Sequence, residues 1–316
     1  MSTQGKNLFI FSKLYSIIVK IYLLKGVLQL KNKHCYIFSL IAAPVCALLR
    51  FVQYVTVIDS DGYFVTNSLV DKCISYSVYA VIAISAVFAL ISLATGNNNE
   101  AKFFDIFSGK AMGYLCILAA LCVMMMSGLR LGSSPHSVPA ILNYALCGTG
   151  ILAAIGIALY GIGALSGGFF SESHGFGVIL PIYFMLLSIS EFFASFERSH
   201  KSESKLYMVA LCALCLFMVS FCLITSSVTV SNKRLVSTAV LYAVCASPVT
   251  IVRLPFTTPT IYDVVESVLH TVLVIIAIII LYKAKPNVEQ KDENVSDKLT
   301  AELDKFITEI PDEEDN

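Results

Sequence analysis

Eight apolar runs, each of roughly 20 residues, constrain the fold of this chain more than any other feature of its sequence. A helix of about 20 apolar residues crosses the hydrocarbon core of a bilayer. Helices are the expected elements because backbone polar groups in lipid must be satisfied internally. The runs predict transmembrane helices over 36–57, 74–94, 111–129, 140–165, 177–195, 206–228, 235–254 and 262–283. The predicted fold class is all-α, a polytopic integral membrane helical bundle with about eight transmembrane helices.

The low content of charged residues supports this class. Only 14% of the residues are charged and 57% are hydrophobic, whereas a soluble domain carries roughly 25% charged residues. The run 235–254 is the weakest of the eight, because Pro248 and Pro255 interrupt it and serine and threonine dilute it. If this run does not span, the C-terminus changes sides of the membrane.

Small residues and tyrosines predict how the helices pack and where they meet the membrane interface. Gly150, Ala154 and Ala158 recur every four residues, with Gly161 close to the next turn, so another helix can approach closely there. Because the chain has no tryptophan, tyrosines are expected to form the interfacial belts. The tyrosines at suitable depths are Tyr54, Tyr76, Tyr207, Tyr262 and Tyr282.

The first 34 residues carry six lysines and no acidic residue. Lys6, Lys13, Lys20 and Lys31 fall on one face of a helix whose remaining surface is largely apolar. We therefore expect residues 1–34 to form a basic amphipathic interfacial helix that lies at the headgroups. A transmembrane helix whose lysines reach the headgroups is the open alternative.

The distribution of Lys and Arg predicts the orientation of the bundle, residues 35–284. More basic residues fall in cytoplasmic than in external segments when the N-terminus is cytoplasmic. Eight spans then return the tail, residues 285–316, to the cytoplasm. The tail carries eleven acidic residues and four lysines, so it is not expected to pack as a domain. It offers a charged surface to a cytoplasmic protein partner.

Motifs for enzymatic chemistry do not appear in the sequence. Eight of the ten cysteines lie inside apolar runs, where thiols behave as small hydrophobic groups. No metal-ligand spacing, phosphate loop or nucleophile–base arrangement is present. No cofactor and no metal are predicted, and a non-enzymatic role is favoured while enzymatic activity stays uncertain. The absence of a basic patch with interleaved aromatics argues against a nucleic-acid partner.

Polar residues inside the apolar runs mark the candidate site. The predicted threading gathers them in the outer half of the membrane, where the expected buried polar cluster comprises Arg50, Gln53, Glu191, Glu266 and His270. Gln53 lies on the same helix face as Arg50. Arg50 is expected to pair with Glu191 or Glu266, since burial of an unpaired arginine is unfavourable.

Three interpretations of this cluster stay open: a structural ion pair, a ligand or ion site, and long side chains that reach the headgroups. Arg130, Arg253 and Asp263 are assigned to ordinary helix ends. The run Asp59–Ser60–Asp61–Gly62 indicates a turn, because it lacks the later ligands of a calcium loop.

A series of residues around the first span resembles a known group of proteins. The pattern Arg50-x-x-Gln53-x-x-Thr56-x-x-Asp59, followed by Gly62-Tyr63-Phe64, is similar to uncharacterised multi-pass membrane proteins of Firmicutes. Pro181 and the final run "YDVVESVLHTVLVIIAIIILYK" look similar too. The resemblance implies the architecture and a bacterial cell membrane, and it carries no activity.

The sequence predicts a non-enzymatic binding or transport-related membrane protein with an outward-facing polar cluster. The alternative is a structural or regulatory membrane protein that recruits a cytoplasmic partner through its charged termini. Both interpretations share the lipid bilayer as a partner and two cytoplasmic termini, and neither identifies a ligand.

Overall fold

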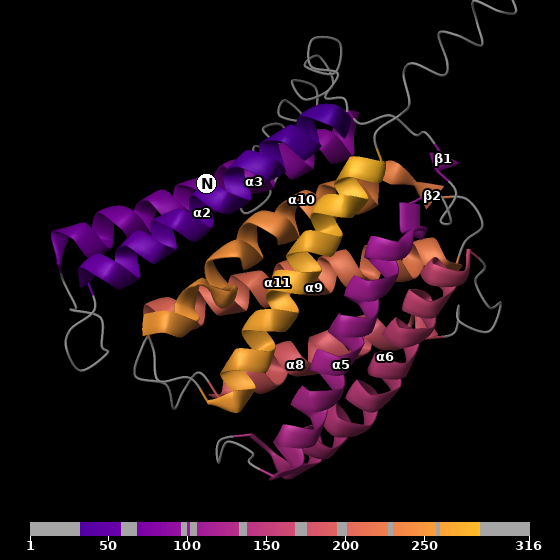
Figure 1. The fold of residues 1–316 in the computed structure, drawn as a ribbon. Coiled ribbons are helices and arrows are strands. Elements are labelled where there is room, and N and C mark those ends of the chain that lie inside the picture. Colours follow the sequence, from indigo (N-terminus) through magenta and orange to yellow (C-terminus); the bar gives the residue numbers. More distant parts are fainter. Residues whose placement is uncertain are drawn as a thin grey trace, which may run out of the picture. The chain divides into compact units, whose positions relative to one another are not determined.

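The computed structural model describes residues 32–57, 68–95, 100–101, 106–132, 138–167, 176–194, 201–226, 230–256 and 260–284. These ranges contain eight α-helices of 15 residues or more. They are α2 (Asn32–Val57), α3 (Leu69–Thr95), α5 (Lys110–Gly132), α6 (Ala140–Ser166), α8 (Ile179–Ala194), α9 (Lys201–Ser226), α10 (Asn232–Ala246) and α11 (Ile261–Lys283), as Figure 1 shows. The all-α prediction is confirmed. The predicted N-terminal helix and the acidic tail lie outside the described residues.

Shorter elements complete the described part of the chain. The two-residue strands β1 (Glu100–Ala101) and β2 (Val230–Ser231) pair antiparallel. Two 3₁₀ helices, η1 (Ser247–Val249) and η2 (Ile251–Phe256), follow α10.

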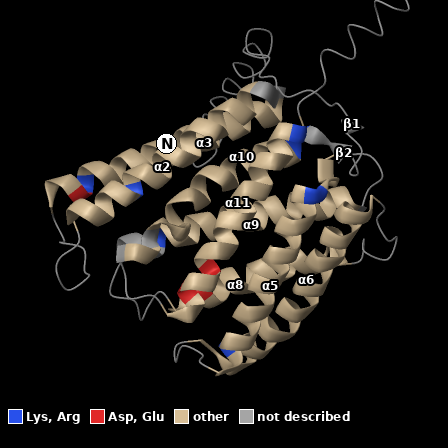
Figure 2. Ribbon diagram, viewed as in Figure 1, with Lys and Arg blue, Asp and Glu red and all other residues tan. Residues whose placement is uncertain are grey.

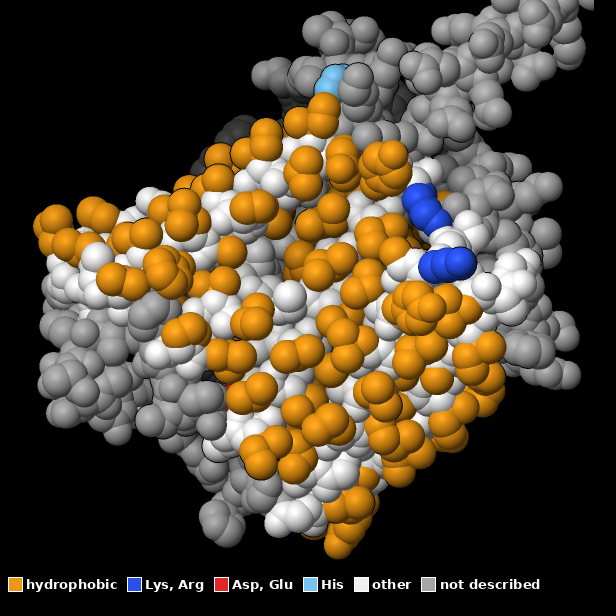
Figure 3. All heavy atoms as spheres, in the orientation of Figure 1, with side chains coloured by type: hydrophobic (Ala, Val, Ile, Leu, Met, Phe, Trp, Pro, Cys, Tyr) orange, Lys and Arg blue, Asp and Glu red, His pale blue; other side chains and the backbone are white. Residues whose placement is uncertain are grey.

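Six of the helices, α2, α3, α5, α6, α9 and α11, are long and apolar enough to cross a membrane. Helix α8 is a shorter apolar helix of 16 residues, and α10 has 15 residues. Figure 3 shows that hydrophobic side chains dominate one face, with basic side chains near one edge. The chain is therefore a multi-pass membrane protein. Each of the eight predicted spans overlaps one of the eight helices.

The helices are arranged as neighbouring pairs around α10. Helix α2 packs on α3, α5 on α6, and α8 on α9, while α10 contacts α2, α3, α9 and α11. Helices α5 and α8 finish at one end of the bundle, and helices α9 and α11 start there. We call this the Arg130 end. At the opposite end α11 finishes and α5 starts, and we call it the Lys283 end. Figure 2 shows that charged positions lie mostly near the helix ends.

Helix α10 breaks inside the bundle. The predicted span 235–254 is α-helical only as far as Ala246. Pro248 lies in η1 and Pro255 in η2, where the missing proline N–H prevents continuation of an α-helix. Side chains stabilise the broken segment: the Ile251 N–H donates to the Thr271 hydroxyl at 3.2 Å. The predicted seventh span is thus a helix followed by two 3₁₀ turns.

Helices α5 and α6 approach closely at glycines. A Cβ atom added at Gly113 would lie 2.8 Å from the carbonyl oxygen of Gly161, and one added at Gly161 would lie 2.9 Å from the Gly113 oxygen. At Gly150 an added Cβ would lie 2.0 Å from the Ser127 hydroxyl. The predicted close approach is confirmed at Gly150 and Gly161, because only glycine leaves room for the neighbouring helix there.

The tyrosines divide into two groups, which corrects part of the predicted belts. Tyr76 and Tyr282 are exposed, as interfacial residues would be. Tyr54 and Tyr207 are instead buried inside the protein, and Tyr262 is half-buried. The hydroxyls of Tyr207 and Tyr262 form hydrogen bonds with ionisable residues, as described next.

Candidate functional site

An ion pair between α5 and α8 forms the centre of the candidate site. The Arg130 Nη2 atom lies 2.6 Å from Glu191 Oε1, and the two side chains are only 5% and 2% exposed. Arg130 Nη1 donates to the Ser190 hydroxyl at 2.5 Å. Nε and Nη2 donate to the Tyr262 hydroxyl at 2.9 and 2.7 Å. The guanidinium is thus held by α8 and α11 together, through charge-assisted hydrogen bonds.

A second carboxylate, Glu266 of α11, lies one helical turn from Tyr262. Glu266 is 1% exposed, and the Tyr207 hydroxyl of α9 donates to its Oε1 atom. Burial of a carboxylate is unfavourable unless it is paired or hydrogen-bonded. Tyr207 supplies such a bond from the neighbouring helix, so α9 joins the site.

His270 extends the site toward α10. Its Nδ1 atom lies 3.1 Å from the Tyr242 hydroxyl, and its ring meets the Tyr207 ring edge-on with centroids 5.7 Å apart. The contacts form two groups, one around Arg130 and one around Glu266 and His270, and both include residues of α11. We call the two groups together the Arg130 network: Arg130, Ser190, Glu191, Tyr207, Tyr242, Tyr262, Glu266 and His270. It links five helices, α5, α8, α9, α10 and α11.

Local sequence explains how α11 presents three of these residues. Tyr262, Glu266 and His270 follow one another at spacings of four, so they share one face of the helix. A capping box sets where that helix begins: the Thr260 hydroxyl accepts from the Asp263 N–H at 3.2 Å, and Asp263 accepts from the Thr260 N–H at 2.9 Å. The assignment of Asp263 to a helix end is confirmed.

Arg50 and Gln53 belong to a polar contact between α2 and α3. Arg50 Nη1 donates to Gln53 Oε1 at 2.6 Å, and its guanidinium lies over the Tyr54 ring, 4.6 Å from the centroid. Gln53 Nε2 donates to Asp71 at 2.5 Å and to Ser75 at 2.8 Å. These bonds join the α2–α3 pair with polar groups near the end of α2.

All five residues of the expected cluster are buried. The structure joins Arg50 to Gln53, whereas it joins Glu191 to Arg130, Glu266 to Tyr207, and His270 to Tyr242. Arg130 was assigned to an ordinary helix end whose side chain reaches the headgroups; it does lie at a helix end, but its side chain is buried and ion-paired, so that interpretation of its role is wrong. Helix α5 continues to Gly132, three residues beyond the predicted span, so Arg130 lies inside its last turn. The fourfold spacing of Tyr262, Glu266 and His270 is a signal that could have located the network.

Asn143 of α6 is a further polar residue near this end. It is 6% exposed, and neither side-chain amide atom has a hydrogen-bond partner among the described residues. The Cys147 thiol donates to the Ser127 carbonyl at 3.2 Å. Asn143 lies one turn beyond Cys147 on α6, and Arg130 one turn beyond Ser127 on the antiparallel α5. The unsatisfied amide therefore lies at the level of Arg130.

The chemistry of the network is hydrogen bonding and charge. In the described ranges, no group of three or more His, Cys, Asp and Glu side chains is arranged to hold a metal ion. The side chains present can bind a polar or charged solute, and they can exchange partners with one another.

Apolar helices with ionisable side chains buried between them define a polytopic α-helical membrane protein. Comparison of the chain with protein families, with curated proteins and with solved structures finds no match. The resemblance to multi-pass proteins of Firmicutes stays a prediction.

Proposed function

We propose that this protein is a non-enzymatic, transport-related membrane component that binds a small cation at the Arg130 network. One observation carries the proposal: four ionisable side chains, Arg130, Glu191, Glu266 and His270, are buried, and each contacts a polar side chain of another helix. Ionisable residues inside membrane spans are unfavourable, and they mark substrate or ion pathways more often than they serve packing alone.

The charge count of the network favours a cation. Glu191 and Glu266 contribute two formal negative charges, and Arg130 contributes one positive charge. With a neutral His270 the sum is −1, from +1 and −2. A net negative charge in a medium of low dielectric constant attracts a compensating positive ion. The unsatisfied Asn143 amide at the same level adds an oxygen acceptor for such a ligand.

The break after α10 supports transport over static binding. Interrupted helices in membrane proteins place free backbone groups beside bound ions and provide points of movement. Here the break follows Ala246, one turn beyond Tyr242, whose hydroxyl contacts His270. The residue after His270, Thr271, accepts from the broken segment. A cation bound at Glu266 therefore lies on α11, the helix whose Thr271 contacts the segment that follows α10.

The Lys and Arg distribution supports an outward-facing network. The Lys283 end of the described bundle carries Lys110, Lys233, Arg234 and Lys283, and the Arg130 end carries Lys72, Arg130, Lys201, Lys205 and Arg253, so the excess at the Lys283 end comes from the N-terminal segment. Six further lysines precede residue 35. The excess of basic residues on the cytoplasmic side makes the Lys283 end cytoplasmic and the Arg130 end external. The proposed setting is a bacterial cell membrane with both termini in the cytoplasm.

Replacement of Glu266 by glutamine tests this function. The change keeps the size of the side chain and an oxygen that accepts from Tyr207, but it removes the charge. We expect at least one of Na⁺, K⁺, ammonium, methylammonium and guanidinium to raise the melting temperature of the wild-type protein in neutral detergent. Glu266→Gln should abolish that shift and melt, without cation, at the wild-type temperature or above.

Asp263→Asn is the matched control, because Asp263 lies on the same helix outside the network and the asparagine side-chain oxygen can still accept from the Thr260 N–H. It should keep the cation response. A purely structural network predicts the opposite pattern: no cation shifts the wild-type melting temperature, and Glu266→Gln melts lower. That result would refute the proposed site.

The charged termini favour a second candidate function, recruitment of a cytoplasmic partner. The contrast between six lysines in residues 1–34 and eleven acids in residues 285–316 supports it. The shift of the melting temperature by a cation distinguishes the two candidate functions. Recruitment of a partner through the termini requires no ligand at the Arg130 network.

A further inference from the structure

Both polar atoms of the Asn143 side chain lack a hydrogen-bond partner among the described residues, although the side chain is only 6% exposed. A buried amide without partners is unfavourable, and such a group in a folded protein calls for an explanation. Because Oδ1 and Nδ2 are both unpaired, the observation holds for either orientation of the amide. A group outside the described contacts is therefore needed to satisfy Asn143.

Helix α6 does not supply the missing partners itself. A polar side chain of a helix can bond to the carbonyl one turn earlier. For Asn143 this is the Pro139 carbonyl, which already accepts from the Leu142 N–H at 2.9 Å and from the Asn143 N–H at 3.2 Å. Thr149, on the same helix, does form such a bond, to the Ala145 carbonyl at 2.7 Å. The partner of Asn143 must come from outside α6.

The spacing along α6 shows what Asn143 faces. It precedes Gly150 by seven residues, or about two turns, so both point to the same side of the helix. A Cβ atom added at Gly150 would lie 2.0 Å from the Ser127 hydroxyl of α5 and 2.9 Å from a ring carbon of Tyr183 of α8. Asn143 therefore faces the contact between α5 and α8, two turns closer to the Arg130 end.

Arg130 and Ser190 lie at the level of Asn143 in this contact. Arg130 follows Ser127 by three residues, Ser190 follows Tyr183 by seven, and α6 runs antiparallel to both α5 and α8. Arg130 Nη1 donates to the Ser190 hydroxyl at 2.5 Å. Nη1 carries two hydrogens, and this is its one hydrogen bond among the described residues. The unpaired amide thus faces a guanidinium nitrogen with a donor to spare.

The two amide atoms restrict the ligand more than the charge of the network does. A metal ion or a simple alkylammonium can use only the Oδ1 atom of Asn143, because Nδ2 is a donor. A hydroxyl group donates to Oδ1 and accepts from Nδ2 or from Arg130, so it satisfies both kinds of atom. An ammonium group on the same molecule compensates the net negative charge of the network.

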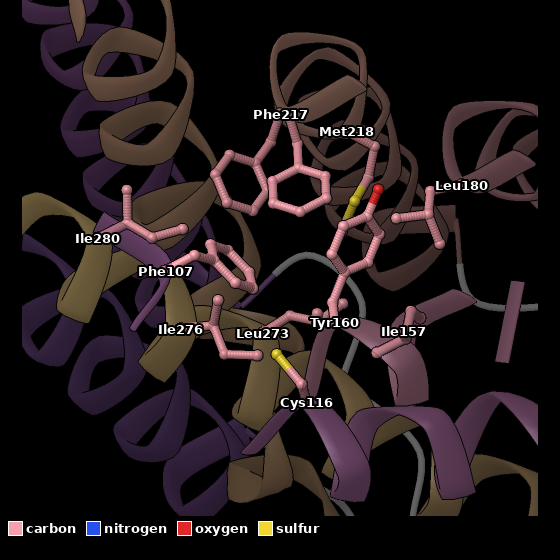
Figure 4. A pocket seen from close by; sticks show the side chains of 11 residues that line it. Phe107, Cys116, Ile157, Tyr160, Leu180, Phe217, Met218, Leu273, Ile276 and Ile280 are labelled. Carbon is pink, nitrogen blue, oxygen red and sulfur yellow. The ribbon is translucent and has the colours of Figure 1, made fainter. Parts of the chain in front are cut away.

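The apolar cavity at the Lys283 end does not suit such a ligand. It has a volume of about 30 Å³ and lies between α5, α6, α8, α9 and α11. Figure 4 shows the rings of Phe107, Tyr160 and Phe217 around this space. A hydroxyl or an ammonium group forms no hydrogen bond with an apolar surface, whereas the Asn143 amide offers a donor and an acceptor.

We infer that Asn143 is a specificity-determining residue of the Arg130 network and selects a small amine that carries a hydroxyl group. The inference rests on the proposed binding of a cation at this network. Arg130 bonds Ser190 through Nη1 and Glu191 through Nη2. A hydroxyl beside Asn143 and Ser190 and an ammonium beside Glu191 are therefore about one guanidinium group apart, a separation that two carbon atoms span.

The test compares 2-aminoethanol with n-propylamine in neutral detergent. The two ammonium ions have the same charge and the same number of heavy atoms, and they differ in a hydroxyl against a methyl group. Wild type should bind 2-aminoethanol with a Kd about 10-fold lower, because a site that pairs with a hydroxyl disfavours the analogue without it. At the same saturating concentration the melting temperature should then be higher by about 2–4 °C.

Variants of α6 assign this preference to the amide. Asn143→Leu is similar in size and apolar, and it should abolish the difference between the two amines. Without ligand it should melt at the wild-type temperature or above, because it removes a buried amide that has no partner. Asn143→Ala provides the same comparison of amines if Asn143→Leu folds poorly. Thr149→Val removes a hydroxyl that bonds within α6 and should keep the preference.

The possible outcomes distinguish this inference from the proposed function. Equal shifts by the two amines in wild type would overturn the inference and leave cation binding at the network in place. A preference for 2-aminoethanol that persists in Asn143→Leu would also overturn it. An ordered water only at Asn143 predicts equal shifts together with a lower melting temperature of Asn143→Leu. The absence of any shift, with these amines and with the cations tested against Glu266→Gln, would refute the proposed function itself.

Discussion

Arg130→Met is expected to lower the free energy of unfolding by about 3–5 kcal/mol, because it leaves the buried Glu191 carboxylate without its cation. The variant also removes the donors to Ser190 and Tyr262. Methionine has a similar length and is apolar, so loss of packing is small compared with the uncompensated charge. Unfolding in mixed micelles of neutral detergent and SDS measures the change.

The double variant Arg130→Met/Glu191→Met measures how loss of the whole ion pair changes the free energy of unfolding, for comparison with loss of one partner. Replacement of both ions by apolar residues is often neutral or stabilising, so the double variant should recover most of the lost stability. Lys72→Met, at an exposed position of α3, is the control and should change stability little. If the double variant were as unstable as the sum of the two single variants, the coupling between Arg130 and Glu191 would be absent.

Alanine at Gly113 or Gly161 is expected to destabilise the protein by about 1–3 kcal/mol, as overpacking of a close contact does. The added Cβ atom at Gly161 would lie 2.9 Å from the Gly113 oxygen, 3.0 Å from a side-chain carbon of Ile117 and 3.1 Å from the Cys116 Cβ. Two of these atoms are fixed by the helix backbone, so relaxation requires α5 and α6 to separate.

Gly128 of α5 and Gly148 of α6 are matched controls on the same two helices. A Cβ at either position would meet no heavy atom within 4 Å. Gly128→Ala and Gly148→Ala should be neutral or stabilising by up to about 1 kcal/mol, because alanine favours the helix. The same SDS titration measures all four variants. Equal effects at all four positions would contradict the close contact and indicate a general effect of glycine replacement.

The number and approximate positions of the helices could be predicted because the membrane imposes one simple requirement on each. An apolar run of the right length specifies a helix, and an α-helix lies at each of the eight runs. Pro248 and Pro255 also indicated that the seventh predicted span is weak, and its α-helix ends at Ala246. Such features are local in sequence, so no knowledge of helix neighbours was needed.

The partners of the buried charges could not be predicted in this way. Depth along a helix is readable from sequence, but the direction a residue faces relative to other helices is not. Arg50 was expected to pair with Glu191 because it lies deeper in its helix than Arg130 does, yet Glu191 meets Arg130 because α8 packs beside α6 and α9, near the end of α5. Tyr207 and Tyr262 likewise suited the interface by depth, while helix packing brings their hydroxyls to Glu266 and Arg130.

Accessibility of epitope tags tests the central claim, that eight crossings bring the buried ionisable groups to the external side. Tags inserted in segments 133–137 and 195–200, which follow α5 and α8, should bind antibody on intact cells that produce the protein. A tag after residue 316 should bind only once the cells are permeabilised. Exposure of the C-terminal tag on intact cells, or of only one of the two internal tags, would contradict this arrangement.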